Sequence, residues 1–169
     1  MKIKRKNFIF VIGGVLLFFL GFFAGWTSKN NQKITPEVTL TKVTRVIDGD
    51  TIEIEGGERV RYIGIDTPET VDPRKPVQCF GIEASKKNKE LVEGKNVRLE
   101  KDITDKDKYG RLLRYVYIDN LFINLELVKQ GFAFSYTYPP DIKYQAEILA
   151  AEAEAREAGR GLWAACPGV

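Results

Sequence analysis

The sequence contains no histidine among its 169 residues. Without an imidazole, Ser-His-Asp hydrolysis, Cys-His proteolysis and His-rich zinc sites are all excluded. The same absence excludes nucleases that use histidine as a base or as a covalent nucleophile. Cysteine is scarce as well, since Cys79 and Cys166 are too few for a zinc site. Any hydrolytic chemistry therefore has to work without histidine.

Acidic residues are absent before Ile34, and this stretch is typical of a membrane anchor. Basic residues dominate positions 2–6, whereas residues 8–26 carry no charge. At about 1.5 Å per residue, such an apolar run matches a hydrocarbon core of about 30 Å. The basic cluster before the run predicts a cytoplasmic N-terminus. We therefore expect a cytoplasmic basic segment (1–7), a transmembrane signal-anchor (8–26), a linker (27–37) and a globular domain (38–169).

A cleaved signal peptide is the alternative interpretation of residues 8–26. Phe22, Phe23 and Trp26 disrupt the small-residue pattern that a cleavage site needs, so an uncleaved anchor is favoured. The predicted location is the cell membrane, with a single span and the domain outside, or secretion if the segment is cleaved. In an oxidising compartment Cys79 and Cys166 can pair, which closes a long loop worth about 4–5 kcal/mol. Two unrelated free thiols are the other possibility.

The domain lacks the positive charge of a protein that binds nucleic acid by bulk attraction. The formal charge of +3 arises from six basic residues that all precede Ile34. Of the 26 lysines and arginines, 20 remain from Ile34 onward, against all 23 acidic residues. A domain with this balance that handles phosphates needs a local basic cluster and a cation.

The hydrophobic pattern predicts five short strands with a helix inserted after the third. Alternating runs predict strands within 38–47, 50–55, 56–65, 96–101 and 111–119. Five strands in this order are typical of a small closed barrel of the OB type. The predicted class is therefore α+β: an OB-fold five-stranded β-barrel with three α-helices, preceded by the N-terminal transmembrane helix.

The three helices are expected at 80–94, 123–131 and 139–159. Glycines at the ends of these segments are plausible helix stops. In the first helix we expect Ile82, Leu91 and Val92 to face inward. In the last, helical spacing predicts an inward face of Ile142, Ala146, Leu149, Ala150 and Ala153.

Acidic residues gather where two predicted strands end. The motif "VIDGDTIEI" places Asp48 and Asp50 at a bend, and "GIDTPET" places Asp66 and Glu69 at the end of the third strand. Such carboxylates, with a backbone carbonyl near Thr67, could bind Ca²⁺, which takes several oxygen ligands. Glu69 would stand farther out, where it could position a water. The alternative is structural, because Asp-Gly and Asp-Thr-Pro also initiate ordinary turns.

Two arginines carry the charge that is complementary to a phosphodiester. Arg61 lies five residues before Asp66 on the same predicted strand, and Arg111 belongs to the tight turn "DKYGR" with Lys108 and Tyr109. Phosphoryl hydrolysis concentrates negative charge on phosphate oxygens, which guanidinium groups stabilise. Arg61 could instead pair with a glutamate across the sheet, and "DKYGR" could be only a turn. Their occurrence together with the acidic cluster favours metal-assisted phosphoryl hydrolysis.

Six motifs in a fixed order resemble the staphylococcal nuclease (thermonuclease) family: "VIDGDT", "RYIGIDTPET", "FGIEAS", "DKYGR", "LVKQGFA" and "GLW". The resemblance covers residues 43–163. It implies an OB barrel with three helices and a calcium-dependent nuclease that cuts DNA and RNA with low sequence specificity. It also implies attack that leaves the phosphate on the 3′ side.

The resemblance extends to individual residues of the acidic cluster. Asp50 and Asp66 resemble calcium ligands, joined by the backbone carbonyl of Thr67, and Asp48 resembles the acidic residue that holds metal-bound water. Glu69 falls at the position assigned as general base, where proton abstraction and simple orientation of the water are both considered.

The basic and aromatic residues also have counterparts in the family. Arg61 and Arg111 resemble the pair that clamps the scissile phosphate. Lys108 and Tyr109 resemble contacts to the neighbouring terminal phosphate. The aromatic wall of the nucleotide pocket is represented by Tyr136 and Tyr138, and stacking on such rings tolerates any base.

Two functions remain to be compared. The first is a monomeric, calcium-dependent phosphodiesterase acting on DNA and RNA. The second is a non-catalytic OB-fold module that binds nucleic acid at the cell surface, since such barrels commonly bind without reacting. A degenerate module would be expected to lose its carboxylates or arginines, and this chain retains all of them. The family prototype lacks cysteine, so a Cys79–Cys166 bridge would be an addition of this chain.

Overall fold

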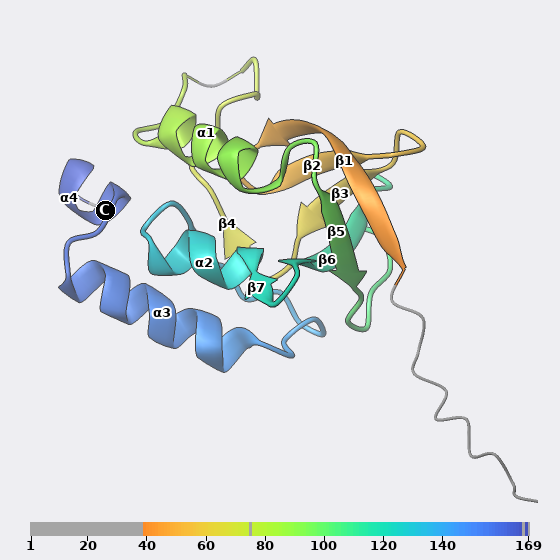
Figure 1. Ribbon diagram of the computed structural model, residues 1–169. Helices are drawn as coiled ribbons and strands as arrows, with labels where there is room; N and C mark the ends of the chain where they lie inside the picture. The colour runs from red at the N-terminus through yellow and green to blue at the C-terminus, as the bar shows by residue number, and fades with distance from the viewer. Residues whose placement is uncertain (1–38, 75, 167, 169) are drawn as a thin grey trace, which may run out of the picture. The chain divides into compact units, whose positions relative to one another are not determined.

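The computed structural model describes residues 39–74, 76–166 and 168. The basic segment, the anchor and the whole linker expected before residue 38 lie outside these residues. Within the part of the chain that is described, no helix has the length and apolar character needed to cross a membrane. Figure 1 shows how the strands and helices are arranged.

Five strands close into a barrel, as the alternating pattern predicts. They are β1 (Leu40–Asp48), β2 (Thr51–Ile54), β3 (Arg59–Tyr62), β5 (Asn96–Glu100) and β6 (Leu112–Ile118). The first three form an antiparallel meander, and β5 pairs with both β1 and β6. Parallel pairing of β3 with β6 closes the ring. The fold is an α+β barrel of the OB type.

The strand β1 pairs with a different neighbouring strand along each of its two halves. Residues 40–42 pair with β5, and Val43 to Asp48 pair with β2. The register shifts twice along the pairing with β2, after Val43 and after Val46. Such irregularities bend a strand and increase its twist, which lets one strand wrap around the core.

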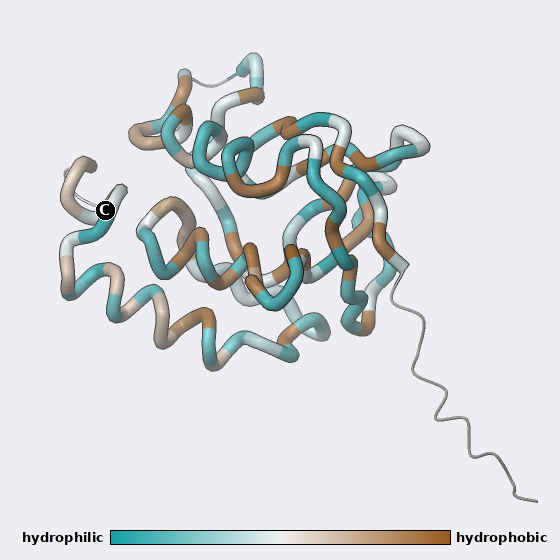
Figure 2. Tube along the Cα trace, in the orientation of Figure 1, coloured by the Kyte–Doolittle hydropathy of each residue, from teal (hydrophilic) through white to brown (hydrophobic). Residues whose placement is uncertain are grey.

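The core is filled by the inward-facing residues of the strands. Val43, Ile52, Val60, Val97 and Val116 are fully buried. Successive side chains of a strand point to opposite faces, so β-branched residues at alternate positions line one interior surface. Figure 2 shows hydrophobic and hydrophilic residues alternating along the strands and helices.

Three two-residue strands complete the sheets. β4 (Ile65–Asp66) pairs with β8 (Phe134–Ser135), and β7 (Leu121–Phe122) pairs with β6. The expectation that Asp66 ends the same strand as Arg61 was wrong. Ile63 and Gly64 form a turn after β3, with Gly64 at a φ of 81° that glycine adopts readily. Asp66 therefore lies on a separate strand that faces β8.

All three predicted helices are present, and a fourth short helix follows them. They are α1 (Gly81–Val92), α2 (Ile123–Lys129), α3 (Gln145–Glu157) and α4 (Leu162–Ala165). Helix α1 packs on β1, while α2 and α3 pack against each other (Figure 1).

The inward face of α1 differs from the prediction at its first turn. Ile82 is 64% exposed, whereas Val92 is buried and Leu91 half-buried as expected. The buried side of α1 carries Ala84 and Asn88. Ile82 lies two positions before Ala84, which rotates it away from this face.

The face of α3 is also shifted from the prediction. The helix begins at Gln145, after the Pro139-Pro140 segment, and its buried residues are Ile148, Ala151 and Ala155. Of the residues predicted to face inward, Ile142 precedes the helix and is 49% exposed, and Leu149 is 43% exposed. Ala146, Ala150 and Ala153 are exposed as well. The spacing predicted a helix correctly, but the predicted face lies on nearly the opposite side of the helix from the buried one, a rotation of about 180° at 3.6 residues per turn.

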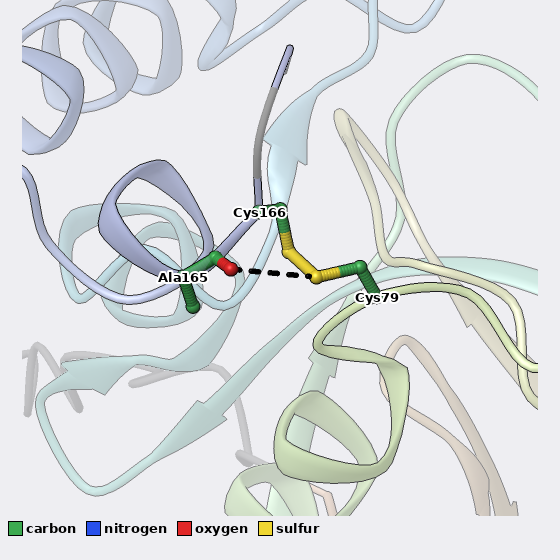
Figure 3. The surroundings of a disulfide bond; sticks show 3 residues. All are labelled: Cys79, Ala165 and Cys166. Atoms are coloured by element: carbon green, nitrogen blue, oxygen red, sulfur yellow. Dashed lines mark hydrogen bonds between the residues drawn. A yellow bond between two sulfur atoms is a disulfide. The ribbon is translucent and has the colours of Figure 1, made fainter.

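A disulfide joins Cys79, which precedes α1, to Cys166, which follows α4 (Figure 3). Their Cα atoms are 5.9 Å apart, and 87 positions separate them in the sequence. The Sγ atom of Cys79 also lies 3.8 Å from the carbonyl oxygen of Ala165. This is a contact and not a proton-donating bond, because a disulfide sulfur carries no hydrogen. The end of the chain is thereby fixed beside the loop that leads into α1.

Candidate active site

The "DGD" bend is both a hairpin turn and an acidic cluster. Asp48 pairs with Thr51 across the β1–β2 ladder, and Gly49 and Asp50 form the two-residue turn between them. The side chains of Asp48 and Asp50 are nevertheless buried, with 7% and 5% of each residue exposed. A Cβ atom at Gly49 would lie 2.6 Å from Oγ1 of Thr67. Glycine is needed here because Thr67 packs directly over the turn.

Hydrogen bonds hold the carboxylate of Asp50 against the segment that follows β4. Its Oδ2 accepts bonds from the backbone N–H of Thr67 at 2.9 Å and from the Thr67 hydroxyl at 3.0 Å. Its Oδ1 accepts a bond from the Thr51 hydroxyl at 3.0 Å. A hairpin turn of the barrel and the "DTPET" segment are thus joined through one carboxylate.

Asp48 is fixed by different partners. Its Oδ1 accepts bonds from the N–H of Gly49 at 2.8 Å and from the Thr70 hydroxyl at 2.6 Å. Its backbone carbonyl accepts a bond at 3.1 Å from Asn88, a fully buried residue of α1. Asn88 in turn accepts a bond from the hydroxyl of Tyr62 on β3. Helix α1 therefore stabilises the acidic turn through Asn88.

Arg61 connects the two strand ends that carry the acidic residues. Its Nη2 lies 2.7 Å from Oδ1 of Asp66 and 3.2 Å from Oδ2 of Asp50. Its Nη1 donates to the backbone carbonyls of Tyr62 and Ile65 at 2.7 and 2.8 Å. The side chain is only 14% exposed. This guanidinium is held in one orientation by four acceptors and does not pair with a glutamate across the sheet.

Burial is the main cause of shifted pKa values among the acidic residues. It raises the pKa of Asp48 to about 6, with a smaller contribution from the charges of Asp50 and Glu69, although hydrogen bonds from Thr70 and Gly49 oppose the shift. Burial also raises the pKa of Asp66, against the opposing charge of Arg61. In both residues the loss of water disfavours the charged carboxylate.

Glu69 lies in the loop after β4, and its carboxylate faces the backbone of the residues that follow it in the chain. Oε1 accepts bonds from the N–H groups of Val71 at 2.7 Å and Asp72 at 3.2 Å. Burial alone would raise its pKa, but these bonds, with contributions from Thr70 and Asp48, lower the pKa below its usual value. Glu69 is therefore ionised over a wide pH range and is a weak proton acceptor.

Arg111 is positioned by Asp107 within the "DKYGR" turn. Oδ2 of Asp107 lies 2.7 Å from Nε of Arg111, and Oδ1 accepts the N–H groups of Arg111 and Tyr109. Arg111 immediately precedes Leu112, which is opposite Val60 in the β3–β6 pairing. Side chains on either side of a buried strand residue point outward. Arg61 and Arg111 therefore leave two paired strands on the same outer surface.

The remaining predicted residues lie on exposed turns. Tyr109 is 72% exposed, and the cations of Lys108 and Arg111 lie 5.0 and 5.4 Å from its ring centre. Tyr136 and Tyr138 are 48% and 61% exposed, with near-parallel rings whose centroids are 6.3 Å apart. The N–H of Tyr136 donates to the carbonyl of Gly64, so this pair begins beside the turn between β3 and β4.

Asp50 and Asp66 are suited to share a hard cation. Both touch the same nitrogen of Arg61, so their facing oxygens are no farther apart than those two distances combined. A cation with oxygen ligands at about 2.3–2.6 Å would have to replace Nη2 of Arg61 beside these two oxygens. Among the described residues, no group of three or more His, Cys, Asp or Glu side chains is already spaced for a metal. Carbonyl oxygens and water would have to complete the coordination.

Several residues that support the site were missed from the sequence. Thr70 and Asn88 hold Asp48, Asp107 orients Arg111, and Gln78 bonds to Glu69. Thr70 and Asp107 lie inside sequence motifs in which only other residues were predicted to form the site. Asn88 had a usable signal, because an asparagine on the buried side of a helix needs hydrogen-bond partners. Gln78 had none, since its role depends on a loop closure that no local pattern indicates.

Comparison with known proteins gives a consistent result. Residues 59–165 match the family model described as "Staphylococcal nuclease homologue". The chain is 45% identical over 138 residues to "Thermonuclease" of Staphylococcus intermedius, covering 80% of this chain and 81% of the relative. It is 37% identical over 174 residues to "Thermonuclease" of Staphylococcus hyicus, covering 96% and 99%. It is also 45% identical over 145 residues to "Endonuclease YncB" of Bacillus subtilis, covering 83% and 67%.

Proposed function

Because the chain belongs to the staphylococcal nuclease family, we propose that it is a calcium-dependent endonuclease that hydrolyses DNA and RNA with low sequence specificity. Family membership makes it a nuclease and hence a hydrolase; the calcium dependence, mechanism and products are the proposal. The observation that carries it is the position of Arg61, held between Asp50 and Asp66 where a phosphate and a cation would meet.

The two arginines would bind the scissile phosphate. The guanidinium of Arg61 contacts two backbone carbonyls and two carboxylates within the site, so its orientation is fixed before substrate arrives. Asp107 bonds to Nε of Arg111 and so fixes the orientation of its guanidinium. Guanidinium groups that are preorganised in this way stabilise the charge that develops on the phosphate oxygens.

Asp50, Asp66 and the carbonyl of Thr67 would hold Ca²⁺, with Asp48 bonding to its water. When bound, calcium would supply positive charge that neutralises the phosphate and makes a nearby water easier to deprotonate. Asp50 and Asp48 are buried and already fixed by threonine hydroxyls, so little side-chain freedom is lost on binding.

Glu69 would orient the attacking water. Its lowered pKa keeps the carboxylate ionised and ready to accept a hydrogen bond, but makes it a poor acceptor of a full proton. Orientation is therefore its larger contribution, and the water gives up its proton to Glu69 only as its oxygen bonds to phosphorus. The P–O5′ bond breaks, the 5′ oxygen takes up a proton from solvent, and the phosphate stays on the 3′ side.

The exposed residues would contact the rest of the substrate. Lys108 and Tyr109, which lie side by side on an exposed turn, would contact a neighbouring phosphate, and the near-parallel rings of Tyr136 and Tyr138 would stack on a base. Stacking of this kind accepts all bases, which suits low sequence specificity. We further propose that the protein is a monomer in the cell membrane, with its N-terminus in the cytoplasm and this domain outside, or a secreted protein if residues 8–26 are cleaved.

A nuclease assay on the full chain tests the proposal. We expect cleavage of DNA and RNA with Ca²⁺, no cleavage with a chelator, and a loss of about 10²–10⁴-fold in rate for Glu69→Gln. The control is Glu83→Gln, which changes an acidic residue on the first turn of α1. Cleavage that survives both the chelator and Glu69→Gln would refute the mechanism. Binding of nucleic acid without cleavage would support the non-catalytic module.

A further inference from the structure

Two hydrogen bonds between Gln78 and the backbone of Glu69, the Gln78 clasp, close the loop that carries Glu69. The Gln78 N–H donates to the carbonyl of Glu69 at 3.0 Å, and its Oε1 accepts the Glu69 N–H at 2.7 Å. Both backbone groups of Glu69 are thus bonded to one residue nine positions later. Gln78 is exposed, and hydrogen bonds of this kind add little stability when water competes for them. The clasp needs Gln78 to be held in place by something else.

The next residue, Cys79, supplies that restraint through its disulfide to Cys166 (Figure 3). Cys166 is itself well anchored, because it is 6% exposed and follows α4, whose Leu162 is fully buried. The N–H of Leu162 donates to the carbonyl of Gly131 at 2.8 Å. The disulfide therefore joins the loop to a segment that is packed against the body of the domain.

The anchored segment leads back to the acidic cluster. Trp163 of α4 packs edge-on against Phe134 of β8, with ring centroids 5.4 Å apart. Phe134 is the residue opposite Asp66 in the β4–β8 pairing. Glu69 and Asp66 are thus linked twice, directly along the chain and through the disulfide, α4 and β8. Two routes between two residues fix their relative position better than one.

We propose that Gln78 and the Cys79–Cys166 disulfide position Glu69 for the nuclease reaction, an inference that rests on the proposed function. Gln78 contacts the backbone of Glu69 and no reacting atom, so it is a positioning residue. Asp50 and Asp66 are held by Thr67 and Arg61, and these contacts do not involve Gln78 or the disulfide. Loss of the clasp should therefore slow the chemical step and leave calcium and substrate binding largely unchanged.

Two variants of the full chain test this: Cys79→Ser with Cys166→Ser, and Gln78→Met, which keeps the length of the side chain but removes the acceptor. Each should lower kcat by about 10- to 100-fold, the cost of displacing a catalytic group by about 1 Å, while KM and the calcium dissociation constant stay within about 2-fold. The control is Val97→Ala, which weakens the core on β5 without contact to the loop. It should leave kcat unchanged at a temperature where circular dichroism shows every variant to be folded.

Repeating the substitutions in a Glu69→Gln background separates positioning from a general structural effect. If the clasp acts through Glu69, removing it there should cause no further loss of rate, because residues that act together are not additive. An equal loss in both backgrounds, or a kcat within about 2-fold of wild type, would overturn the inference for that variant. If the cysteine variant does not fold, Gln78→Met decides alone. A wild-type chain without calcium-dependent cleavage would instead overturn the proposed function, and this inference with it.

Discussion

Nη2 of Arg61 lies 3.2 Å from Oδ2 of Asp50, and the two side chains are only 14% and 8% exposed. The pair therefore sits largely out of water, where each charge depends on the other. The same oxygen of Asp50 is the one bonded to Thr67. A substitution at Arg61 should consequently affect both the chemistry and the stability of the metal-free protein.

Arg61→Gln should lower the cleavage rate by at least about 100-fold, because a preorganised donor to the phosphate is lost. It should also lower the free energy of unfolding without calcium by about 3 kcal/mol, since Asp50 is left buried without its partner. Urea titrations with and without Ca²⁺ measure this, and calcium should restore part of the loss. Arg59→Gln, at an exposed position on the same strand, is the control. Equal stability of the two variants without calcium would contradict the prediction.

Asp48 should make the metal-free protein less stable as pH rises. Its pKa of about 6 in the folded state exceeds the usual value for aspartate, so folding favours the protonated form. The stabilisation is present in full below about pH 4 and is lost as pH rises through about 6. Asp48→Asn should remove this dependence and stabilise the metal-free protein at pH 7 by up to about 2 kcal/mol. Urea unfolding between pH 4 and 7.5 compares the two proteins, and parallel pH profiles would disprove the assignment.

Loss of the disulfide should be costly for stability as well as for positioning. It closes a loop spanning 87 positions, so the chain-entropy model gives about 4–5 kcal/mol for its contribution. Cys79→Ser with Cys166→Ser should lower the free energy of unfolding by up to this amount. Mass spectrometry of the unreduced protein should show one Cys79–Cys166 link. Two thiols open to alkylation in the folded protein would rule the link out.

Asn88→Ala should weaken calcium binding through Asp48. The substitution removes the bond to the Asp48 carbonyl and leaves the buried hydroxyl of Tyr62 without its acceptor, at a cost of about 2–3 kcal/mol. Asn124→Ala is the matched control, because Asn124 is equally buried and bonds to Val116 and Ile63 away from the acidic turn. Both variants should lose stability, but only Asn88→Ala should reduce calcium affinity by calorimetry. Equal affinities would show that Asp48 does not depend on this support.

The barrel and the composition of the site could be predicted because both depend on local patterns. Alternating β-branched residues specify strands, and turn residues specify where they end. Asp48 and Asp50 stood out because acidic residues are depleted in strands, and Arg61 because its charge complements a phosphodiester. The predicted roles of these residues, and the predicted membrane anchor in 8–26, stay predictions.

The parts that could not be predicted depend on contacts between distant segments. Ile82 was assigned to the wrong side of α1 because hydrophobicity alone does not tell which face meets the barrel. Asp66 was placed on the strand of Arg61 because a two-residue strand has no signal of its own. Gln78 acquires its role only when a loop folds back on Glu69, which sequence spacing does not reveal.

The parallel pairing of β3 with β6 has a consequence for when the protein becomes active. It places Arg61 opposite Leu113, near the start of β6 that Arg111 directly precedes, and it is also the contact that completes the ring. Contacts between such distant segments tend to form late in folding, after local hairpins. If both arginines bind one phosphate, as proposed, a chain that has not yet paired β3 with β6 holds them apart, and nuclease activity should appear only when the ring is complete.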